Sequence, residues 1–95
     1  MSLSVASKTR ERIDSVLQSI QQQRGLPPVP LEEGHQVMAD LGFASLDVAQ
    51  LIALLEIELG VDPFAAGVSL QEVHTVGELY RVYQDACNKA AGQAP

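Results

Sequence analysis

Residues 41–60 read LGFASLDVAQLIALLEIELG and carry the clearest helix signal in the chain. Residues 45–59 are good helix formers, and Gly60 followed by Pro63 is the stop signal expected just past a helix end. At about 100° per residue, one narrow stripe of this helix is predicted to face the core: Val48, Ile52, Leu55 and Leu59. A second, largely apolar side lies outside that stripe: Leu46, Gln50, Ala53 and Ile57. The helix therefore either packs on two sides or keeps one side for a partner.

The segment before this helix predicts a first amphipathic helix and a long connection. Residues 4–23 carry apolar side chains at helical spacing: Ile13, Val16, Leu17 and Ile20. Gly25 and the prolines at positions 27, 28 and 30 end this helix, because proline lacks an amide donor and restricts the residue before it. The connection then reaches about Phe43, and four apolar residues can pin it to the core: Val29, Leu31, Val37 and Leu41.

The segment after it predicts a short helix or turn over residues 68–74 and a last helix. Thr75 with Glu78 three residues later matches a capping box, so the last helix should begin there. Its apolar stripe continues through Val76, Leu79, Tyr80, Tyr83 and Cys87. Because no β-type alternation competes, we predict an all-α bundle of three main helices plus one short helix.

Length and charge limit the classes of function. The 95 residues suit one domain, which we place at 1–95 with a core of about 8–88 and flexible tails at 1–4 and 91–95. The net charge is −6, and residues 25–80 contain no Lys or Arg but nine Asp and Glu. Such a surface repels phosphate backbones, so we expect neither nucleic acid nor a membrane as partner. Proteins with basic surfaces are the expected partners.

The single cysteine, Cys87, excludes an internal disulfide and a multi-cysteine metal site. Apolar runs are far shorter than the roughly 20 residues of a membrane span. We therefore expect a monomeric cytoplasmic protein. Cys87 shares a helical stripe with Tyr80 and Tyr83, which favours a buried small side chain over a reactive thiol.

Ser45 stands where a glycine-containing loop becomes a helix. The start of a helix offers free amide donors and a partial positive charge, which suit a phosphate ester on the serine oxygen. Serine is also a frequent N-cap, and spacing alone favours that simpler interpretation. A third possibility, a nucleophilic serine of an enzyme, lacks a Gly-x-Ser-x-Gly elbow and a placed base.

The residues around Ser45 point further. The stretch Leu41-Gly42-Phe43-Ala44-Ser45-Leu46-Asp47, followed by Leu51, Leu55, Glu56 and Leu59-Gly60-Val61, resembles the acyl carrier protein family, whose typical motif is Leu-Gly-x-Asp-Ser-Leu. The stretch Thr75-Val76-Gly77-Glu78-Leu79 resembles the start of that family's last helix, and the likeness spans roughly residues 8–88. It implies the family's four-helix arrangement and a 4′-phosphopantetheine arm attached to Ser45 by a transferase. A carrier of this kind performs no bond chemistry itself.

Two departures from the family pattern bear on the partners. Ala44 replaces the usual Asp before the serine, which in the family contributes to recognition by the transferase and to its metal site. Gln50 and Ile57 occupy positions where a fatty-acid carrier usually presents glutamates, although Asp47 and Glu56 keep their charge. We therefore expect less electrostatic contacts and a dedicated pathway.

The resemblance also suggests which residues meet partners and cargo. We expect a docking face made of Leu46, Asp47, Gln50 and Ile57. An acyl chain can tuck between the helices of the family, and the candidates to line that space, or simply to pack, are Val48, Ile52, Leu55, Leu59, Leu79 and Tyr83. His35 and His74 lack the spacing of a metal site or a catalytic triad, and we give them no role.

The sequence thus predicts a discrete acyl carrier protein, not an enzyme. It would carry acyl or aminoacyl groups as thioesters for a specialised lipid, polyketide or related pathway. The implied partners are a phosphopantetheinyl transferase, an acyl-loading ligase or acyltransferase, and a ketosynthase or other pathway enzymes. The alternative is an unmodified, carrier-like helical adaptor that only binds other proteins, with Ala44 as its sign.

Overall fold

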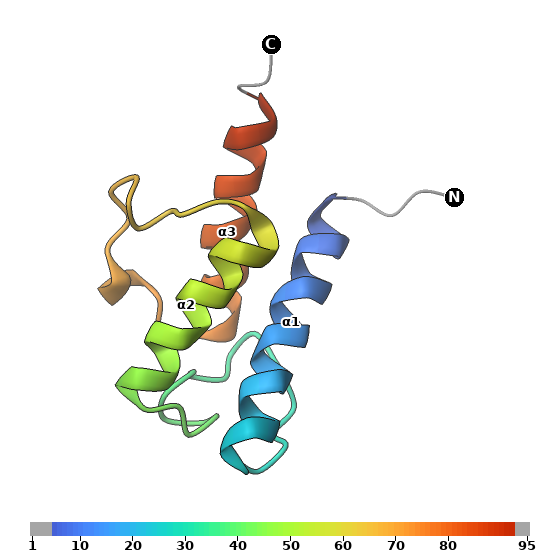
Figure 1. Cartoon of the computed structure of the whole chain (residues 1–95), viewed down its shortest axis with the longest axis vertical. Helices are drawn as coiled ribbons and strands as arrows, with labels where there is room; N and C mark the ends of the chain where they lie inside the picture. Colours follow the sequence, from blue (N-terminus) through green and yellow to red (C-terminus); the bar gives the residue numbers. More distant parts are fainter. Residues whose placement is uncertain (1–4, 93–95) are drawn as a thin grey trace.

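The computed structural model describes the backbone of residues 5–92 and the side chains of residues 8–90. Three α-helices form its frame (Figure 1): α1 (Val5–Arg24), α2 (Ser45–Leu59) and α3 (Val76–Gly92). A short 3₁₀ helix, η1 (Leu70–Glu72), lies in the connection from α2 to α3. The described residues contain no strand beyond one isolated antiparallel bridge between Gln36 and Thr75. The predicted all-α bundle of three main helices and one short helix is confirmed.

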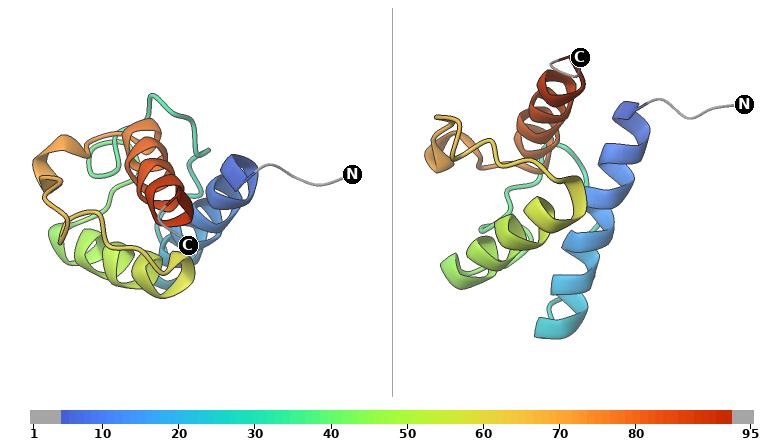
Figure 2. Two further views of the ribbon diagram at one scale, coloured as in Figure 1. Left: turned by 90° about the horizontal axis from the view of Figure 1, so that it is seen from above. Right: turned by 45° about the horizontal axis from the view of Figure 1, so that its top comes forward.

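Helix α1 packs against both other helices (Figure 2). Its predicted stripe is correct, because Ile13, Leu17 and Ile20 are fully buried. The helix ends at Arg24, and the next residue, Gly25, has a φ of 65° that lets the Leu26 amide donate to the Gln21 carbonyl over 2.9 Å. None of the helices within residues 5–92 is long and apolar enough to cross a membrane.

Helix α2 differs from its predicted packing. Its fully buried side chains are Leu51 and Leu55, whereas Val48, Ile52 and Leu59 of the predicted stripe are only half-buried. The stripe therefore missed Leu51. The physical reason is that α1 covers one side of α2, while Val48 and Ile52 face a cavity on another side. The most buried residues of α2 therefore lie between the side covered by α1 and the side that faces the cavity.

The long connection from α1 to α2 is bound to the start of α3. The Val37 amide donates to the His74 carbonyl, the Val76 amide to the His35 carbonyl, and the Gly77 amide to the Glu33 carbonyl, over 2.9, 2.9 and 3.0 Å. Val37, Leu41 and Phe43 are buried in the core, and Val29 and Leu31 pack against it. The expectation that apolar residues pin this connection is confirmed, and the pinned segment delivers the chain to Ser45.

Helix α3 begins with the predicted capping box. The Glu78 amide donates to Thr75 Oγ1 over 3.1 Å, and the Thr75 amide donates to Glu78 Oε1 over 3.0 Å. The helix extends to Gly92, so Ala91 and Gly92 are helical and do not belong to the expected tail. The rest of the expected tails, residues 1–4 and 93–95, lies outside the described residues. Of the α3 stripe, Cys87 is half-buried and not fully buried as expected.

Candidate functional site

Ser45 is the first residue of α2, and its side chain is exposed. The N-cap is the preceding residue, because the backbone of Ala44 is extended (φ −84°, ψ 171°) and its carbonyl accepts the first helical bond from the Val48 amide over 3.0 Å. The interpretation of Ser45 as the cap is therefore wrong. Its hydroxyl makes no hydrogen bond to the part of the chain that the structure describes, so it remains available for chemistry.

Asp47 holds the start of α2 in place. Its Oδ2 accepts a hydrogen bond from the Ala44 amide over 2.9 Å, and its Oδ1 accepts one from Arg24 Nε over 2.8 Å. Only 3% of the residue is exposed. Our expectation that Asp47 belongs to the docking face is therefore wrong, because both carboxylate oxygens are bound within the chain.

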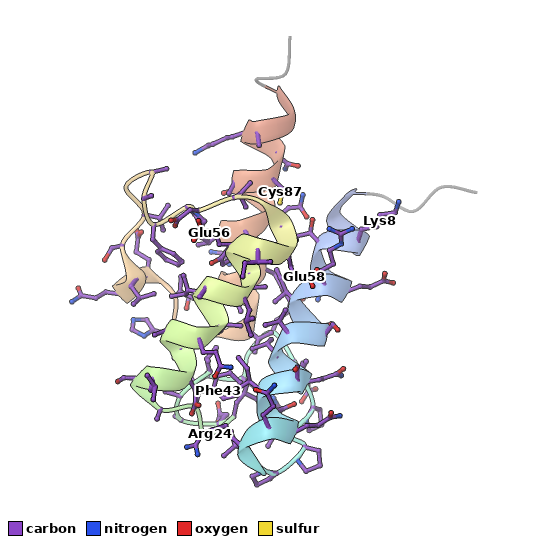
Figure 3. The ribbon with its side chains drawn as sticks, viewed as in Figure 1. Lys8, Arg24, Phe43, Glu56, Glu58 and Cys87 are labelled. Atoms are coloured by element: carbon purple, nitrogen blue, oxygen red, sulfur yellow. The ribbon has the colours of Figure 1, made fainter. Side chains whose placement is uncertain are left out.

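The position of Asp47 carried a signal for this role. An acidic residue three positions after an N-cap is the second half of a capping box. The signal was missed because alanine at position 44 cannot make the reciprocal side-chain bond. Arg24, the last residue of α1, lies 23 positions away and no local pattern pairs it with Asp47. The pair joins the end of α1 to the start of α2, where Arg24 and Phe43 are seen in Figure 3.

The other expected docking residues lie exposed on one side of α2. Leu46 is 81% exposed and Ile57 is 79% exposed, and Gln50 between them is exposed and hydrogen-bonds Gln23 of α1 over 3.3 Å. Exposed aliphatic side chains on one side of a helix are what a docking face requires, and the assignment of this side to partners stays a prediction. Glu56 and Glu58 supply negative charge at the far end of the same helix (Figure 3).

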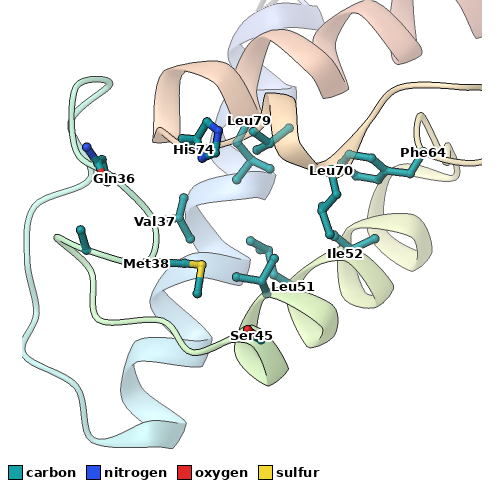
Figure 4. Close-up of a pocket in the computed structure, with 13 residues that line it drawn as sticks. Gln36, Val37, Met38, Ser45, Leu51, Ile52, Phe64, Leu70, His74 and Leu79 are labelled. Atoms are coloured by element: carbon teal, nitrogen blue, oxygen red, sulfur yellow. The ribbon is translucent and has the colours of Figure 1, made fainter.

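A cavity of about 350 Å³ opens beside Ser45 between α2, the long connection and α3 (Figure 4). Three of the expected lining residues are there: Val48, Ile52 and Leu79. Leu55, Leu59 and Tyr83 are not part of the lining, which corrects that expectation. Leu55 and Tyr83 are fully buried in the core, and Leu59 packs against its edge.

Leu51 of α2 also lines the cavity. The other walls come from the connections before α2 and after it, which helical periodicity cannot place. Their apolar residues are Val37, Met38, Ala39, Phe64, Leu70 and Val73. His74 and Gln36 add polar groups to the lining (Figure 4), so His74, to which we gave no role, lies at the site. His35 instead bonds the Pro30 carbonyl through Nδ1 over 2.7 Å within the long connection.

The arrangement suits a covalently attached cargo better than catalysis. An exposed hydroxyl at a helix start can bear a phosphate ester, and the neighbouring cavity can shelter an apolar chain. No histidine or carboxylate among the described residues hydrogen-bonds the Ser45 hydroxyl, so Ser45 is not paired with a base in the described geometry. The same residues contain no group of side chains suited to a metal ion.

We compared the chain with known protein families, curated proteins and solved structures. A scan against models of protein families gives no match, and a search of curated proteins gives none either. Among solved structures, the chain is similar to MacpD, an acyl carrier protein from Pseudomonas fluorescens involved in mupirocin biosynthesis. The two are 32% identical with a TM-score of 0.73, and the similarity covers 96% of this chain and 76% of that one.

Proposed function

The chain belongs to the acyl carrier protein family, and from this premise we propose that it carries acyl intermediates on a 4′-phosphopantetheine arm attached to Ser45. As a member of the family it is a carrier protein and not an enzyme. The similarity to a carrier involved in mupirocin biosynthesis supports a specialised, polyketide-type pathway over general fatty-acid synthesis. We assign residues 1–95 to one carrier domain with its core at about 8–88.

The observation that carries the proposal is the setting of the Ser45 hydroxyl. It is exposed, it is not used as a cap, and it stands at the mouth of an apolar cavity. The amides of the first turn of α2 offer hydrogen bonds to a phosphodiester at this position. The residues present therefore fit the arm.

The chain's own residues position and shelter the cargo. The arm supplies a terminal thiol that holds an acyl group as a thioester. Asp47 and Arg24 fix the start of α2, so that the direction in which Ser45 leaves the surface is set by two helices. Val48, Ile52 and Leu79 offer apolar surface that keeps water from a buried acyl chain.

Partners would dock on the exposed side of α2 formed by Leu46, Gln50 and Ile57. This docking face is close to Ser45 at one end and to Glu56 and Glu58 at the other. The transferase, a loading ligase or acyltransferase, and a ketosynthase with basic rims around an apolar groove would suit it. The single cysteine is compatible with the reducing cytoplasm that we propose as its location.

The test is the intact mass of the protein after incubation with coenzyme A and a broad-specificity phosphopantetheinyl transferase. We expect the mass of one arm to be gained by the wild-type protein and by Ser69→Ala, and not by Ser45→Ala. Ser69 is a matched control because it is an exposed serine that caps η1. An arm on Ser45→Ala would overturn the assignment of the site.

The adaptor alternative rests on Ala44. If the wild-type protein stays unmodified with broad-specificity transferases while Ala44→Asp is modified, then alanine at position 44 prevents attachment of the arm. The docking face would then serve protein binding alone. Modification of the wild-type protein excludes this alternative.

A further inference from the structure

The hydroxyl of Tyr83 is a feature of the core that the proposed function leaves unused. The residue is fully buried, and its hydroxyl has no hydrogen-bond partner among the described residues. Buried polar groups in native structures are nearly always paired, so an orphan of this kind calls for an explanation. Burial, followed by the charges of Asp62 and Glu56, raises the pKa of the Tyr83 phenol, and the group therefore remains an O–H donor at any physiological pH.

Tyr83 neighbours two residues that line the cavity. It follows Leu79, a lining residue, by one turn on the same side of α3. Phe64, which also lines the cavity (Figure 4), packs edge-on against the Tyr83 ring with centroids 6.1 Å apart at 71°. Leu79 and Phe64 thus line the cavity and neighbour Tyr83, which is itself outside the lining.

Phe64 belongs to an irregular segment that can let it move. The segment between α2 and η1 is held by turn bonds, including Ala65 amide to Asp62 Oδ1 over 3.2 Å and Gly67 amide to Phe64 carbonyl over 3.3 Å. The second of these bonds uses the Phe64 carbonyl, and the half-buried Phe64 side chain is held by packing alone, so a change of its rotamer breaks no hydrogen bond. Such a rotation would lengthen the cavity toward Tyr83.

We propose that the cavity takes an acyl chain bearing an oxygen substituent far from the thioester, and that the Tyr83 hydroxyl donates a hydrogen bond to this oxygen once Phe64 turns aside. The inference rests on the proposed function of Ser45. A carbonyl or hydroxyl group on the chain would lose its hydrogen bonds to water on entering the apolar cavity, and Tyr83 replaces one of them. A saturated chain would leave the phenol unpaired, so the site distinguishes the two classes of cargo.

The test uses chains installed chemically, which makes it independent of any transferase. Ser45→Cys in a Cys87→Ala background is alkylated with a saturated chain, or with a chain of equal length that bears a carbonyl near its far end. Chemical shifts of the Leu79 and Phe64 side chains report the fraction of chain inside the cavity. We expect the bound-to-free ratio to be about fivefold higher for the oxygenated chain, the factor of one neutral hydrogen bond.

Two matched variants isolate the phenol. Tyr83→Phe deletes only the hydroxyl, so the bound-to-free ratio should become equal for the oxygenated and the saturated chain. Tyr80→Phe should leave the ratio unchanged, because the Tyr80 hydroxyl donates to Asp14 of α1 and does not face the cavity. Equal binding of the two chains to the parent protein, or a preference that survives Tyr83→Phe, would overturn the inference.

A direct readout covers the case in which Tyr83→Phe does not fold. In the parent protein, the ζ-carbon resonance of Tyr83 should shift on loading with the oxygenated chain and stay in place with the saturated one. The same resonance position with both chains refutes the inference. Failure of the proposed function is seen separately, as the absence of a mass gain at Ser45.

Discussion

At the scale of single residues, Asp47 decides how the serine is presented. Its carboxylate accepts a hydrogen bond from the Ala44 amide, as in the second half of a capping box, and also accepts one from the guanidinium of Arg24. Asp47 is buried whereas Arg24 is half exposed, so the hydrogen bond to the Ala44 amide is the better protected of the two. A carboxylate that faced solvent would leave the Ala44 amide without this hydrogen bond.

We therefore expect Asp47→Ala to lower the free energy of unfolding by roughly 2 kcal/mol, the range for a lost hydrogen bond to a charged group. Urea denaturation measures it. Arg24→Ala removes only the half-exposed partner and should cost less than about 1 kcal/mol. Equal losses in the two variants would contradict the role given to the Ala44 amide.

At the scale of elements, the close approach of the long connection to α3 depends on a glycine. A Cβ atom on Gly77 would lie 3.0 Å from Glu33 Cβ and 3.1 Å from the Glu33 carbonyl oxygen. The same carbonyl oxygen accepts a hydrogen bond from the Gly77 amide. A side chain at position 77 would therefore require the connection at Glu33 to give way by a few tenths of an ångström.

Gly77→Ala should destabilise the protein by about 1 to 3 kcal/mol, because the connection must shift away. This sign opposes the gain of up to about 1 kcal/mol that alanine usually brings inside a helix. Gly34→Ala is the control, since a Cβ at that position meets nothing within 4 Å. A stabilised Gly77→Ala variant in thermal unfolding would show that the contact is not formed.

The contribution of the α3 capping box to the stability of the protein depends on pH. The hydrogen bonds from the His74 and Thr75 amides lower the pKa of the Glu78 carboxyl below its ordinary value of 4.5. A lowered folded-state pKa means that its stabilising contribution is present above the unfolded pKa and is lost as pH falls through the folded pKa.

We expect Glu78→Gln to be less stable than wild type at neutral pH and to lose less stability on acidification below pH 4.5. Thermal unfolding across acidic pH measures the difference. Glu72→Gln serves as a comparison, because it alters the equivalent capping position of η1 instead of α3. Parallel pH profiles for wild type and Glu78→Gln would contradict the assignment.

At the scale of the whole molecule, the exposed aliphatic side chains of α2 lie within a stretch of sequence that is rich in acidic residues. Residues 25–80 contain no Lys or Arg, and within that range α2 exposes Leu46 and Ile57 on the same side. The connection between α2 and α3 lies on the side of α2 away from α1 (Figure 1), so the docking face stays uncovered by the described chain. A partner can therefore reach Ser45 and the docking face together.

Leu46→Asn should raise the KM of a broad-specificity phosphopantetheinyl transferase roughly tenfold, because a buried leucine side chain contributes about 1.5 to 3 kcal/mol to an interface. Ile57→Asn tests the far end of the same face. Gln71→Ala, an exposed change on η1, should leave KM unchanged. Unaltered KM values in both α2 variants would remove the docking face from the proposal, whereas altered unfolding would point to the fold instead.

The helices, the capping box of α3 and the place of Ser45 at a helix start were predictable from the sequence. Each of these features depends on residues within about four positions of one another, such as Thr75 with Glu78 or Gly60 after Leu59. The resemblance around residues 41–47 likewise uses a continuous stretch, and the structural similarity to an acyl carrier protein confirms the family.

The burial of Asp47, the buried line through Leu51 and the walls of the cavity were decided by tertiary structure alone. Asp47 meets Arg24 across 23 positions, and Phe64 reaches both the cavity and Tyr83 from a segment without periodicity. Helical spacing states which side of a helix is apolar, but it does not state which neighbour covers that side. Only the packing of the connections against α2 and α3 determines which side chains are enclosed, which line a space and which hydroxyl is left without a partner.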